Sequence, residues 1–396
     1  MDAASISRLL EPDGWALLSA LPPYDEARAM ALSKRLHAEG LDPALVAAAL
    51  TQSRLRAKAH AKFGDFADGM LFTVAGLEQA TRLEVAAFHA RRYLAAGATT
   101  VADLTCGIGA DAMAMAGVGL TVIAAELDEV TAAIATVNLR HFPEATVRHA
   151  DGLALDLTGV DAVFADPARR TSSGARVGDP AAYTPPLDRV LEVRARVPAL
   201  GLKVGPALPH RAVPPDAHAQ WVSVDGEVVE AGLWFGALAP EGPGRSALVL
   251  RAGRPFVVLD DPDAPQADTG PVGAYLYEPD GAVIRAGLVQ QVAHEVRGRL
   301  IDPTIAYVTA DRLAPTPVAA TYRVLDEMPF AVKRLRTYLR ERGVGRLTVK
   351  KRGTAVTPEA LRGQLDLRGD AEATVVLTRV AGAQRVLVVE PVAGGD

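Results

Sequence analysis

The sequence predicts a multidomain α/β protein whose central domain is a doubly wound parallel sheet. From residue 99 onward, short apolar runs alternate with stretches of helical periodicity. The runs TTVADL, LTVIAAE, ATVRHAD, DAVFADP and LGLKVG are apolar for most of their length, as is typical of parallel strands buried on both faces. The chain has 396 residues, which is more than one ordinary domain, so we expect flanking domains as well.

Helices are predicted before the sheet. The segment 42–63 begins with Asp42 as an N-cap and Pro43 at the first helical position. A further helix is expected over 77–95, where LEQATRLEVAAFHARRYLAA keeps a helical spacing of apolar residues.

Changes in composition divide the rest of the chain. After the parallel strands, QWVSVDGEVVEAGLWFGAL and RSALVLRAG have little helix between them and predict antiparallel strands at one edge. The Pro- and Asp-rich stretch LDDPDAPQADTGP is the strongest candidate for a linker. The predicted parts are an N-terminal helical region (1–98), the α/β domain (99–255), a small α+β module (270–318) and a C-terminal α+β domain (320–393).

Composition limits the classes of protein. A single cysteine excludes an intramolecular disulfide and a cysteine-rich metal site, and the eight histidines show no metal-ligand spacing. The start MDAASISRLLEPDG does not resemble a signal peptide, and no apolar run reaches the 18 residues of a membrane span. We expect a cytoplasmic protein with no metal and no membrane partner.

The glycine-containing turn VADLTCGIGAD raises three alternatives: a nucleotide-binding loop, a reactive cysteine, or a tight strand-to-helix connection. Gly107 and Gly109 follow a strand that ends at Asp103, and they let a ligand approach the main chain. A dinucleotide site would normally have a third glycine here, and Asp111 would repel a pyrophosphate. The loop alone is weak evidence for any ligand.

Acidic residues at the ends of the next strands strengthen the case for a ligand. Glu126, Asp151 and Asp166 follow three predicted strands, whose carboxyl ends meet at the ligand-binding edge of a parallel sheet. Glu126 suits a ribose diol, Asp103 suits an ammonium group, and Asp151 with Gly152 suits an adenine amine. A ligand with these three parts and no phosphate is S-adenosylmethionine.

Together, VADLTCGIGAD, AAELD, HADG and FADPARR resemble the ordered motifs of class I (Rossmann-like) S-adenosylmethionine-dependent methyltransferases. More closely, LEQATR, DPARR and LTVKKRG…TPEALRGQLDLRG resemble a bacterial family in which this domain carries a THUMP-like C-terminal domain. The resemblance implies S-adenosylmethionine as cofactor, a ferredoxin-like module over 270–318 and a THUMP-like domain over 320–393. It also implies binding of RNA, most often transfer RNA.

The resemblance assigns the cofactor-binding positions. Cys106 is then a small packing residue beside the methionine moiety, which disfavours pyrimidine C5 methylation because that reaction needs a cysteine nucleophile. The implied cofactor-binding residues are Gln79, Asp103, Leu104, Thr105, Cys106, Gly107, Gly109, Glu126, Leu127, Asp151 and Gly152.

The D-P-x-x element implies the acceptor site. In relatives with D/N-P-P-Y/F, the acid accepts a hydrogen bond from the target nitrogen and the aromatic residue stacks on a flipped base. Asp166 and Pro167 keep the first part, but Ala168 and Arg169 replace the second proline and the aromatic residue. Arg169 is predicted to stack on a base or bind a phosphate; the alternative is an ion pair with a local acid. We take Asp166, Pro167 and Arg169 as the candidate catalytic residues.

A basic segment completes the prediction. Residues 323–352 hold ten Lys and Arg against three acids, in a protein of net charge −5, which marks a candidate surface for a polyanion. The predicted RNA contacts are Lys333, Arg334, Arg336, Lys350, Lys351 and Arg352. The leading hypothesis is methylation of a base nitrogen of structured RNA, either transfer or ribosomal. The alternatives are a non-catalytic factor that binds cofactor and RNA, a small-molecule methyltransferase and a nicotinamide dehydrogenase.

Overall fold

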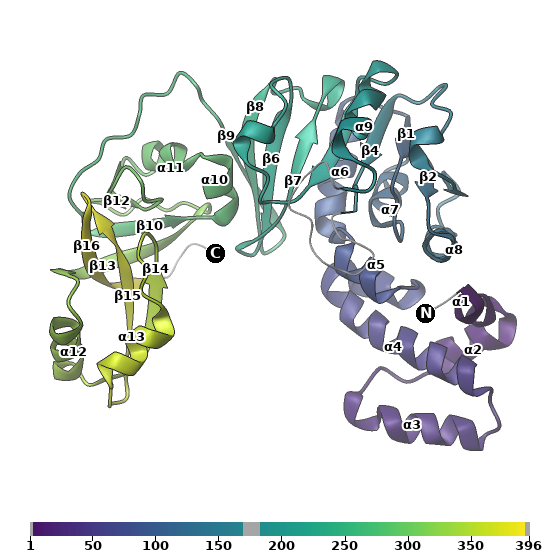
Figure 1. The fold of residues 1–396 in the computed structure, drawn as a ribbon, viewed down its shortest axis with the longest axis horizontal. Helices are drawn as coiled ribbons and strands as arrows, with labels where there is room; N and C mark the ends of the chain where they lie inside the picture. The colour runs from purple at the N-terminus through teal and green to yellow at the C-terminus, as the bar shows by residue number, and fades with distance from the viewer. Residues whose placement is uncertain (1–2, 169–182, 393–396) are drawn as a thin grey trace. The chain divides into compact units, whose positions relative to one another are not determined.

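The computed structural model describes residues 3–168 and 183–392 (Figure 1). The chain forms two compact units. The first comprises Met1–Val204 with Leu233–Gly242, and the second comprises Gly205–Gly232 with Pro243–Asp396. No helix of the described residues is long and apolar enough to cross a membrane.

The N-terminal part of the first unit is helical, as expected. Asp42 caps the long helix α4 by accepting hydrogen bonds from the backbone N–H groups of Ala44 and Leu45, with Pro43 at the first position. Gly64, in a positive-φ conformation, ends it. The helices are α1 (Ala3–Leu10), α2 (Pro12–Ala20), α3 (Glu26–Ala38), α4 (Pro43–Phe63), α5 (Val74–Gln79) and α6 (Leu83–Ala95).

The prediction of one helix over 77–95 is wrong, because the chain breaks between α5 and α6. The Lys62 side chain from α4 satisfies the free carbonyl groups at the end of α5, so the helix ends there without continuing. Lys62 Nζ donates to the carbonyl oxygens of Leu77, Glu78 and Ala80 at 2.8, 2.9 and 2.8 Å. The periodicity of residues 77–95 could not reveal this break, because it depends on a contact with a residue in another helix.

Five parallel strands of the first unit run in the order β3-β2-β1-β4-β5. The order reverses direction between β1 and β4, which is where doubly wound sheets bind ligands. The strands are β1 (Thr100–Asp103), β2 (Thr121–Glu126), β3 (Ala145–His149), β4 (Ala162–Ala165) and β5 (Leu200–Val204). The connecting helices are α7 (Ala110–Gly117), α8 (Glu129–Asn138) and α9 (Leu187–Glu192). The predicted Rossmann-like α/β fold is confirmed.

The strand β3 differs from its prediction as a buried strand. Its residues are exposed or half-buried, whereas β4 and β5 are fully buried. The reason is its position at the edge of the sheet, where it pairs with one strand, β2.

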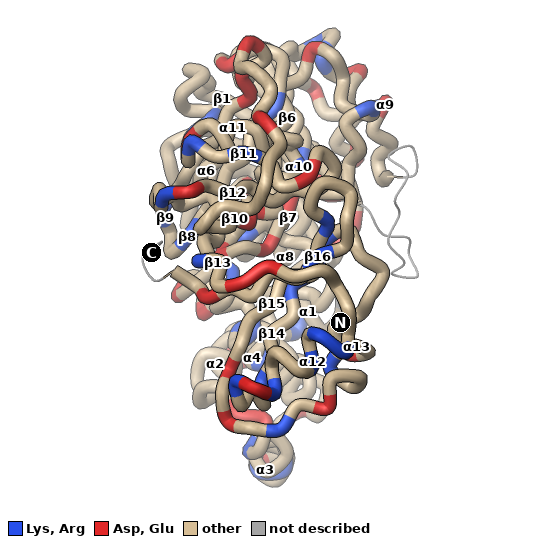
Figure 2. The backbone as a smooth tube through the Cα atoms, turned by 90° about the vertical axis from the view of Figure 1, so that its left-hand side faces the viewer, with Lys and Arg blue, Asp and Glu red and all other residues tan. Residues whose placement is uncertain are grey.

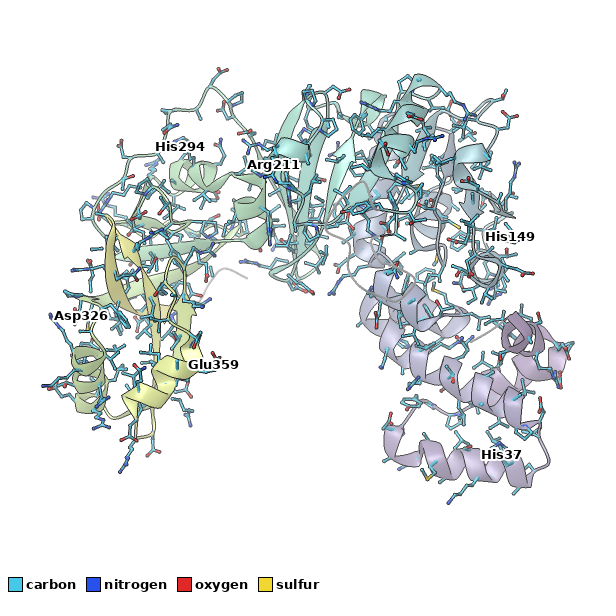
Figure 3. All side chains as sticks on the ribbon, in the orientation of Figure 1. His37, His149, Arg211, His294, Asp326 and Glu359 are labelled. Carbon is cyan, nitrogen blue, oxygen red and sulfur yellow. The ribbon has the colours of Figure 1, made fainter. Side chains whose placement is uncertain are left out.

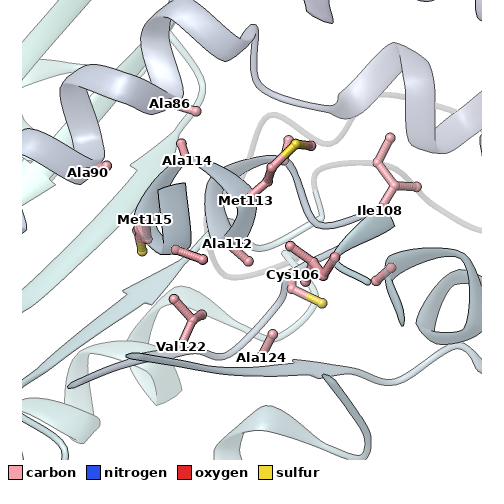
Figure 4. Close-up of a cluster of buried hydrophobic side chains, with 14 of the residues drawn as sticks. Ala86, Ala90, Cys106, Ile108, Ala112, Met113, Ala114, Met115, Val122 and Ala124 are labelled. Carbon is pink, nitrogen blue, oxygen red and sulfur yellow. The ribbon is translucent and has the colours of Figure 1, made fainter. Parts of the chain in front are cut away.

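The core of the first unit lies between the helices and the sheet. Side chains of α7, β1 and β2 pack together there, with Met113, Cys106 and Val122 among them (Figure 4). Tyr93 of α6 packs edge-on against the rings of Phe164 and Trp234 and donates its hydroxyl hydrogen to the Val163 carbonyl at 2.8 Å. This packing fixes the sheet beneath the strand ends.

Four further strands run in the order β7-β6-β8-β9, and all of them lie in the second unit except the last two residues of β7, which belong to the first. Their bounds are β6 (His218–Val224), β7 (Glu227–Trp234), β8 (Gly244–Arg251) and β9 (Arg254–Leu259). The strands β6 and β7 join through the two-residue turn Asp225–Gly226, and β8 pairs antiparallel with β9. The expectation of antiparallel strands at one edge therefore holds for β8 and β9, whereas β6 and β8 pair in parallel. Because β7 already occupies one edge of β6, β8 joins the other edge.

A seven-stranded sheet forms the rest of the second unit, in the order β11-β12-β10-β13-β16-β15-β14. In this sheet β14 and β15 pair in parallel, and the other neighbouring strands pair antiparallel. The strands are β10 (Tyr275–Pro279), β11 (Arg299–Leu300), β12 (Val308–Ala310), β13 (Ala319–Pro329), β14 (Val344–Lys351), β15 (Ala371–Val380) and β16 (Ala383–Pro391). The helices are α10 (Gly281–Ala286), α11 (Val289–Glu295), α12 (Val332–Glu341) and α13 (Pro358–Leu365). Strands from 270–318 and from 320–393 thus share one sheet, and the predicted domain boundaries stay a prediction.

Candidate active site

A cavity of about 1070 Å³ lies in the first unit, at the carboxyl ends of the parallel strands. It collects nearly all the positions predicted to bind the cofactor. Its lining includes Gln79, Asp103, Leu104, Thr105, Cys106, Gly107, Glu126, Leu127, Asp151 and Gly152, together with Asp166 and Thr81. Among the other predicted site residues, Gly109 and Pro167 do not line it, and Arg169 lies outside the described residues.

The loop after β1 is shaped by its two glycines. Gly107 has φ 55° and Gly109 has φ 90°, a region that L side chains rarely adopt. Gly107 borders the cavity, and its backbone N–H donates to Glu126 Oε2 at 3.0 Å. A Cβ at Gly109 would lie 3.3 Å from the Leu139 side chain, so this glycine lets α7 start close to the end of α8. Its contribution to the site is therefore indirect.

The two acids that follow β2 and β3 are held in place by backbone groups. Glu126 accepts from Gly107 through one oxygen and from the Asp128 N–H through the other at 2.9 Å. Asp151 Oδ1 accepts from the Leu153 N–H at 2.9 Å. Both carboxylates keep lone pairs for a ligand in the cavity.

Gly152 is fixed by close packing. A Cβ at this position would lie 2.0 Å from the Leu104 carbonyl oxygen, so no side chain fits. The absence of a side chain lets the loop after β3 lie against the loop after β1, and both line the same cavity.

Asp103, at the end of β1, is the most unusual acid of the site. It is 1% exposed; its Oδ1 accepts from the Thr105 N–H at 3.1 Å, and its Oδ2 has no hydrogen-bond partner. Burial, followed by the neighbouring charge of Asp111, raises the pKa of Asp103 well above its usual range. An unpartnered buried carboxylate oxygen beside a cavity is suited to a cationic group.

A buried polar chain that sequence reasoning did not assign reaches the cavity through Asp111 and Thr81. Asp111 of α7 accepts a hydrogen bond from His89 Nδ1 of α6 at 2.8 Å and from the Thr81 hydroxyl at 2.6 Å. Burial acts to raise the pKa of Asp111, but the His89 hydrogen bond and charge outweigh it and hold that pKa below its usual value. His89 and Asp111 carried no local signal, because each is a single polar residue in a helix.

Asp166, at the end of β4, pairs with Lys203 from β5. Lys203 Nζ lies 2.5 Å from Asp166 Oδ2 and 2.8 Å from Thr81 Oγ1, and Lys203 is 4% exposed. The Asp166 backbone N–H also donates to the Thr105 hydroxyl oxygen at 2.6 Å. Next along the chain, Ala168 pairs with Thr184 through two backbone hydrogen bonds. The acid of the D-P-x-x element is thus tied to both the first loop and β5.

Cys106 is unsuited to nucleophilic chemistry. Its side chain is buried within the core cluster, and burial raises the pKa of the thiol well above its usual value. The thiol therefore stays protonated at neutral pH.

No group of three or more metal-ligating side chains that could hold an ion occurs among the described residues. Figure 3 shows His37, His149 and His294 on separate elements, namely α3, the end of β3 and α11.

The basic segment is only partly free for a ligand. Lys350 pairs with Glu278 at 2.6 Å, and Arg352 lies 3.9 Å from the same carboxylate, so two of the predicted RNA contacts are already paired. The Arg336 guanidinium donates to the Gln364 carbonyl. The exposed Lys333, Arg334 and Lys351 have no acidic partner in the described part of the chain. Figure 2 shows basic residues along α12, which carries the first two.

Comparisons with known proteins bear on both units. Residues 319–391 match the family model described as THUMP domain-like, and residues 2–59 match a domain of unknown function. Two relatives from Mycobacterium tuberculosis, strains CDC 1551 / Oshkosh and ATCC 25618 / H37Rv, are named uncharacterised S-adenosylmethionine-dependent methyltransferases. Each is 35% identical over 335 residues, which is 82% of this chain and 90% of the relative.

A solved structure shares the fold. It comes from Porphyromonas gingivalis W83 and was solved under the description of a methyltransferase. The match has a TM-score of 0.74 at 22% identity and covers 94% of this chain and 100% of the solved one.

Proposed function

The chain belongs to the S-adenosylmethionine-dependent methyltransferases, and from this premise we propose that it methylates a base nitrogen of structured RNA, either transfer or ribosomal. The observation that carries the proposal is the group of strand-end acids around one cavity. Asp103, Glu126, Asp151 and Asp166 all border it, as four different loops reach the same sheet edge.

The cavity suits the cofactor on its own chemistry. The unpartnered Oδ2 of Asp103 would accept the ammonium group, Glu126 would accept from the ribose hydroxyls, and Asp151 would accept from the adenine amine. The cofactor supplies a methyl group on a sulfonium, an electrophile whose leaving group is a neutral thioether. The chain's own residues then have to orient the acceptor and exclude water.

Asp166 is the proposed acceptor-binding residue. Its carboxylate borders the cavity and would accept a hydrogen bond from the N–H of the target nitrogen, which leaves the lone pair free to react. Pro167 would keep the main chain extended here, and Arg169 is proposed to contact the base or a phosphate. The missing aromatic residue of the D-P-x-x element leaves Arg169 as the only stacking group we propose.

RNA is favoured over a small molecule by the second unit. The THUMP-like match over 319–391 supports it, as do the exposed side chains of Lys333, Arg334 and Lys351. Exposed cations without a partner gain from neutralising phosphates, because condensed counterions are released.

The test combines binding and transfer. The purified protein is titrated calorimetrically with S-adenosylmethionine and, separately, with NADH, and is then incubated with a labelled methyl donor and total small RNA. Cofactor binding with label on RNA base nitrogens is the expected result. Cofactor binding without label would favour a non-catalytic RNA-binding factor or a small-molecule acceptor. Binding of NADH alone would contradict the proposal entirely.

A further inference from the structure

Lys203 is a buried cation placed behind the cavity rather than in it. It is 4% exposed and does not line the cavity, whereas its partner Asp166 does. Its ammonium group lies 2.5 Å from Asp166 Oδ2. Burying a charged lysine costs several kcal/mol unless it is paired. We therefore expect the buried ammonium group of Lys203 to act on its partner, the Asp166 carboxylate.

The hydroxyl of Thr81 fixes the direction of the hydrogen bonds around Lys203. Because Thr81 donates its one proton to Asp111, at 2.6 Å, its oxygen is left to accept from Lys203 Nζ at 2.8 Å. Asp111 is held in turn by His89. The contacts therefore form one polar chain from α6 through α7 and the α5–α6 break to β5 and Asp166.

The charges of this region explain why a cation is needed. Among the described residues, Asp111 from α7 interacts with Lys203 and Asp103 from β1 interacts with Asp166, and these two acids interact in turn with His89 from α6 and Glu126 from β2. Asp111, Asp166 and Glu126 all repel negative charge on Asp103. Without Lys203, Asp166, whose side chain is 23% exposed, would have to carry its charge near Asp103, which favours the protonated acid.

We propose that Lys203 is a positioning residue for methyl transfer. It keeps Asp166 ionised and fixes its orientation, so that the carboxylate can only accept a hydrogen bond from the group that is to be methylated. The Thr81 hydroxyl holds the Lys203 ammonium group in the position that this requires. The inference rests on the proposed function and narrows its substrate class: the acceptor presents an N–H donor, as an exocyclic amino group does. A carboxylate already neutralised by an ammonium group is too weak a base to deprotonate a ribose hydroxyl.

The test is a double-mutant cycle on methyl transfer to RNA. The proteins compared are the wild type, Lys203→Met, Asp166→Asn and the double variant, with Lys34→Met on the exposed face of α3 as the charge-matched control. Lys203→Met is expected to lower kcat about 100-fold while cofactor affinity and KM for RNA stay within about threefold. In the Asp166→Asn background, where the Asp166 carboxylate no longer needs a counterion, the same change is expected to lower kcat much less.

The pH profile separates positioning from a merely structural role. The kcat of Lys203→Met is expected to recover partly as the pH rises, because an aspartate that has lost its ammonium partner holds its proton to a higher pH. An equal loss of kcat in both backgrounds, or a loss that pH does not change, would overturn the inference.

A second variant covers the possibility that Lys203→Met does not fold. Thr81→Val removes only the hydroxyl that orients Lys203 and keeps every charge, so kcat is expected to fall about tenfold at unchanged cofactor affinity. An unchanged kcat for Thr81→Val would contradict the inference. A wild-type protein that binds the cofactor and labels no RNA would instead refute the proposed function, and the inference would fail with it.

Discussion

Two regions of the molecule treat charge in opposite ways. At the carboxyl edge of the parallel sheet, Asp103 and Lys203 are almost completely buried. On the seven-stranded sheet, by contrast, the paired side chains of Arg346 and Glu372 stay at the surface, where they are 71% and 69% exposed. A buried charge is expensive and therefore fixed to one arrangement, whereas an exposed pair gains little and exchanges partners easily. The first region is built for one small ligand, and the second can adapt to a large one.

The largest expected effect is a loss of stability on substitution of Gly152, in the loop after β3 that borders the buried charges. Gly152→Ala would force a Cβ within 2.0 Å of the Leu104 carbonyl oxygen, so the two loops have to separate. We expect a loss of roughly 3 kcal/mol in the free energy of unfolding, measured by urea denaturation. The matched control lies in the second unit: a Cβ at Gly363 of α13 meets nothing within 4 Å. Gly363→Ala should therefore increase the free energy of unfolding by about 1 kcal/mol. An equal change in the free energy of unfolding for Gly152→Ala and Gly363→Ala would contradict the difference proposed between the two regions.

Asp103→Asn should change cofactor affinity and protein stability in opposite directions. The variant is expected to lose about 2 kcal/mol of S-adenosylmethionine affinity, measured by calorimetry, because a charge-assisted hydrogen bond is lost. Without ligand it should be more stable than the wild type by about 1 kcal/mol at pH 8, because no unpartnered charge is buried.

The stability difference should depend on pH in a defined direction. Burial raises the pKa of Asp103, so the folded protein holds this proton to a higher pH than the unfolded chain does. Wild-type stability therefore falls as the pH rises from the ordinary aspartate pKa toward the raised one, and the advantage of Asp103→Asn should vanish near pH 4. A constant advantage across this range would show that the Asp103 charge is not its source.

Glu126→Ala is expected to have an effect of about 1–3 kcal/mol on cofactor affinity. Glu126 is less buried than Asp103, and both of its oxygens already accept backbone hydrogen bonds. Calorimetric titration measures the change, and an unchanged affinity would refute the assignment of the ribose site.

The smallest effect is expected on the exposed surface. Replacing Lys333 and Arg334 together by alanine should reduce the slope of log affinity for RNA against log salt by about 2, with little change in stability. Arg346→Ala is the control, because Glu372 already neutralises this side chain. Filter binding at several salt concentrations measures the slope. An equal reduction of the slope in both variants would show that unpaired and paired cations contribute equally to RNA binding.

The site residues that could be predicted from the sequence are those with a local signal. Asp103, Glu126 and Asp166 could be found because each directly ends or follows an apolar strand, and parallel strands bring such ends together. The loop glycines gave a second signal, although Gly109 proved to serve packing against α8 rather than the cavity.

The connection between the members of the polar chain was beyond sequence reasoning. Thr81, His89, Asp111 and Lys203 come from four separate segments, and no local pattern shows that they hydrogen-bond to one another. The break before α6 escaped for the same reason, since it depends on Lys62 reaching α5 from another helix. Interactions between distant segments leave no periodicity to detect.

The place of β16 in its sheet links the order of synthesis to the order of folding. This strand lies between β13 and β15, although it follows both in the chain. Until residues 383–391 have been synthesised, β13 and β15 each lack the strand that pairs with both of them. The sheet closes only when residues 383–391 emerge, so this unit depends on late, nonlocal pairing and folds after its own helices are complete.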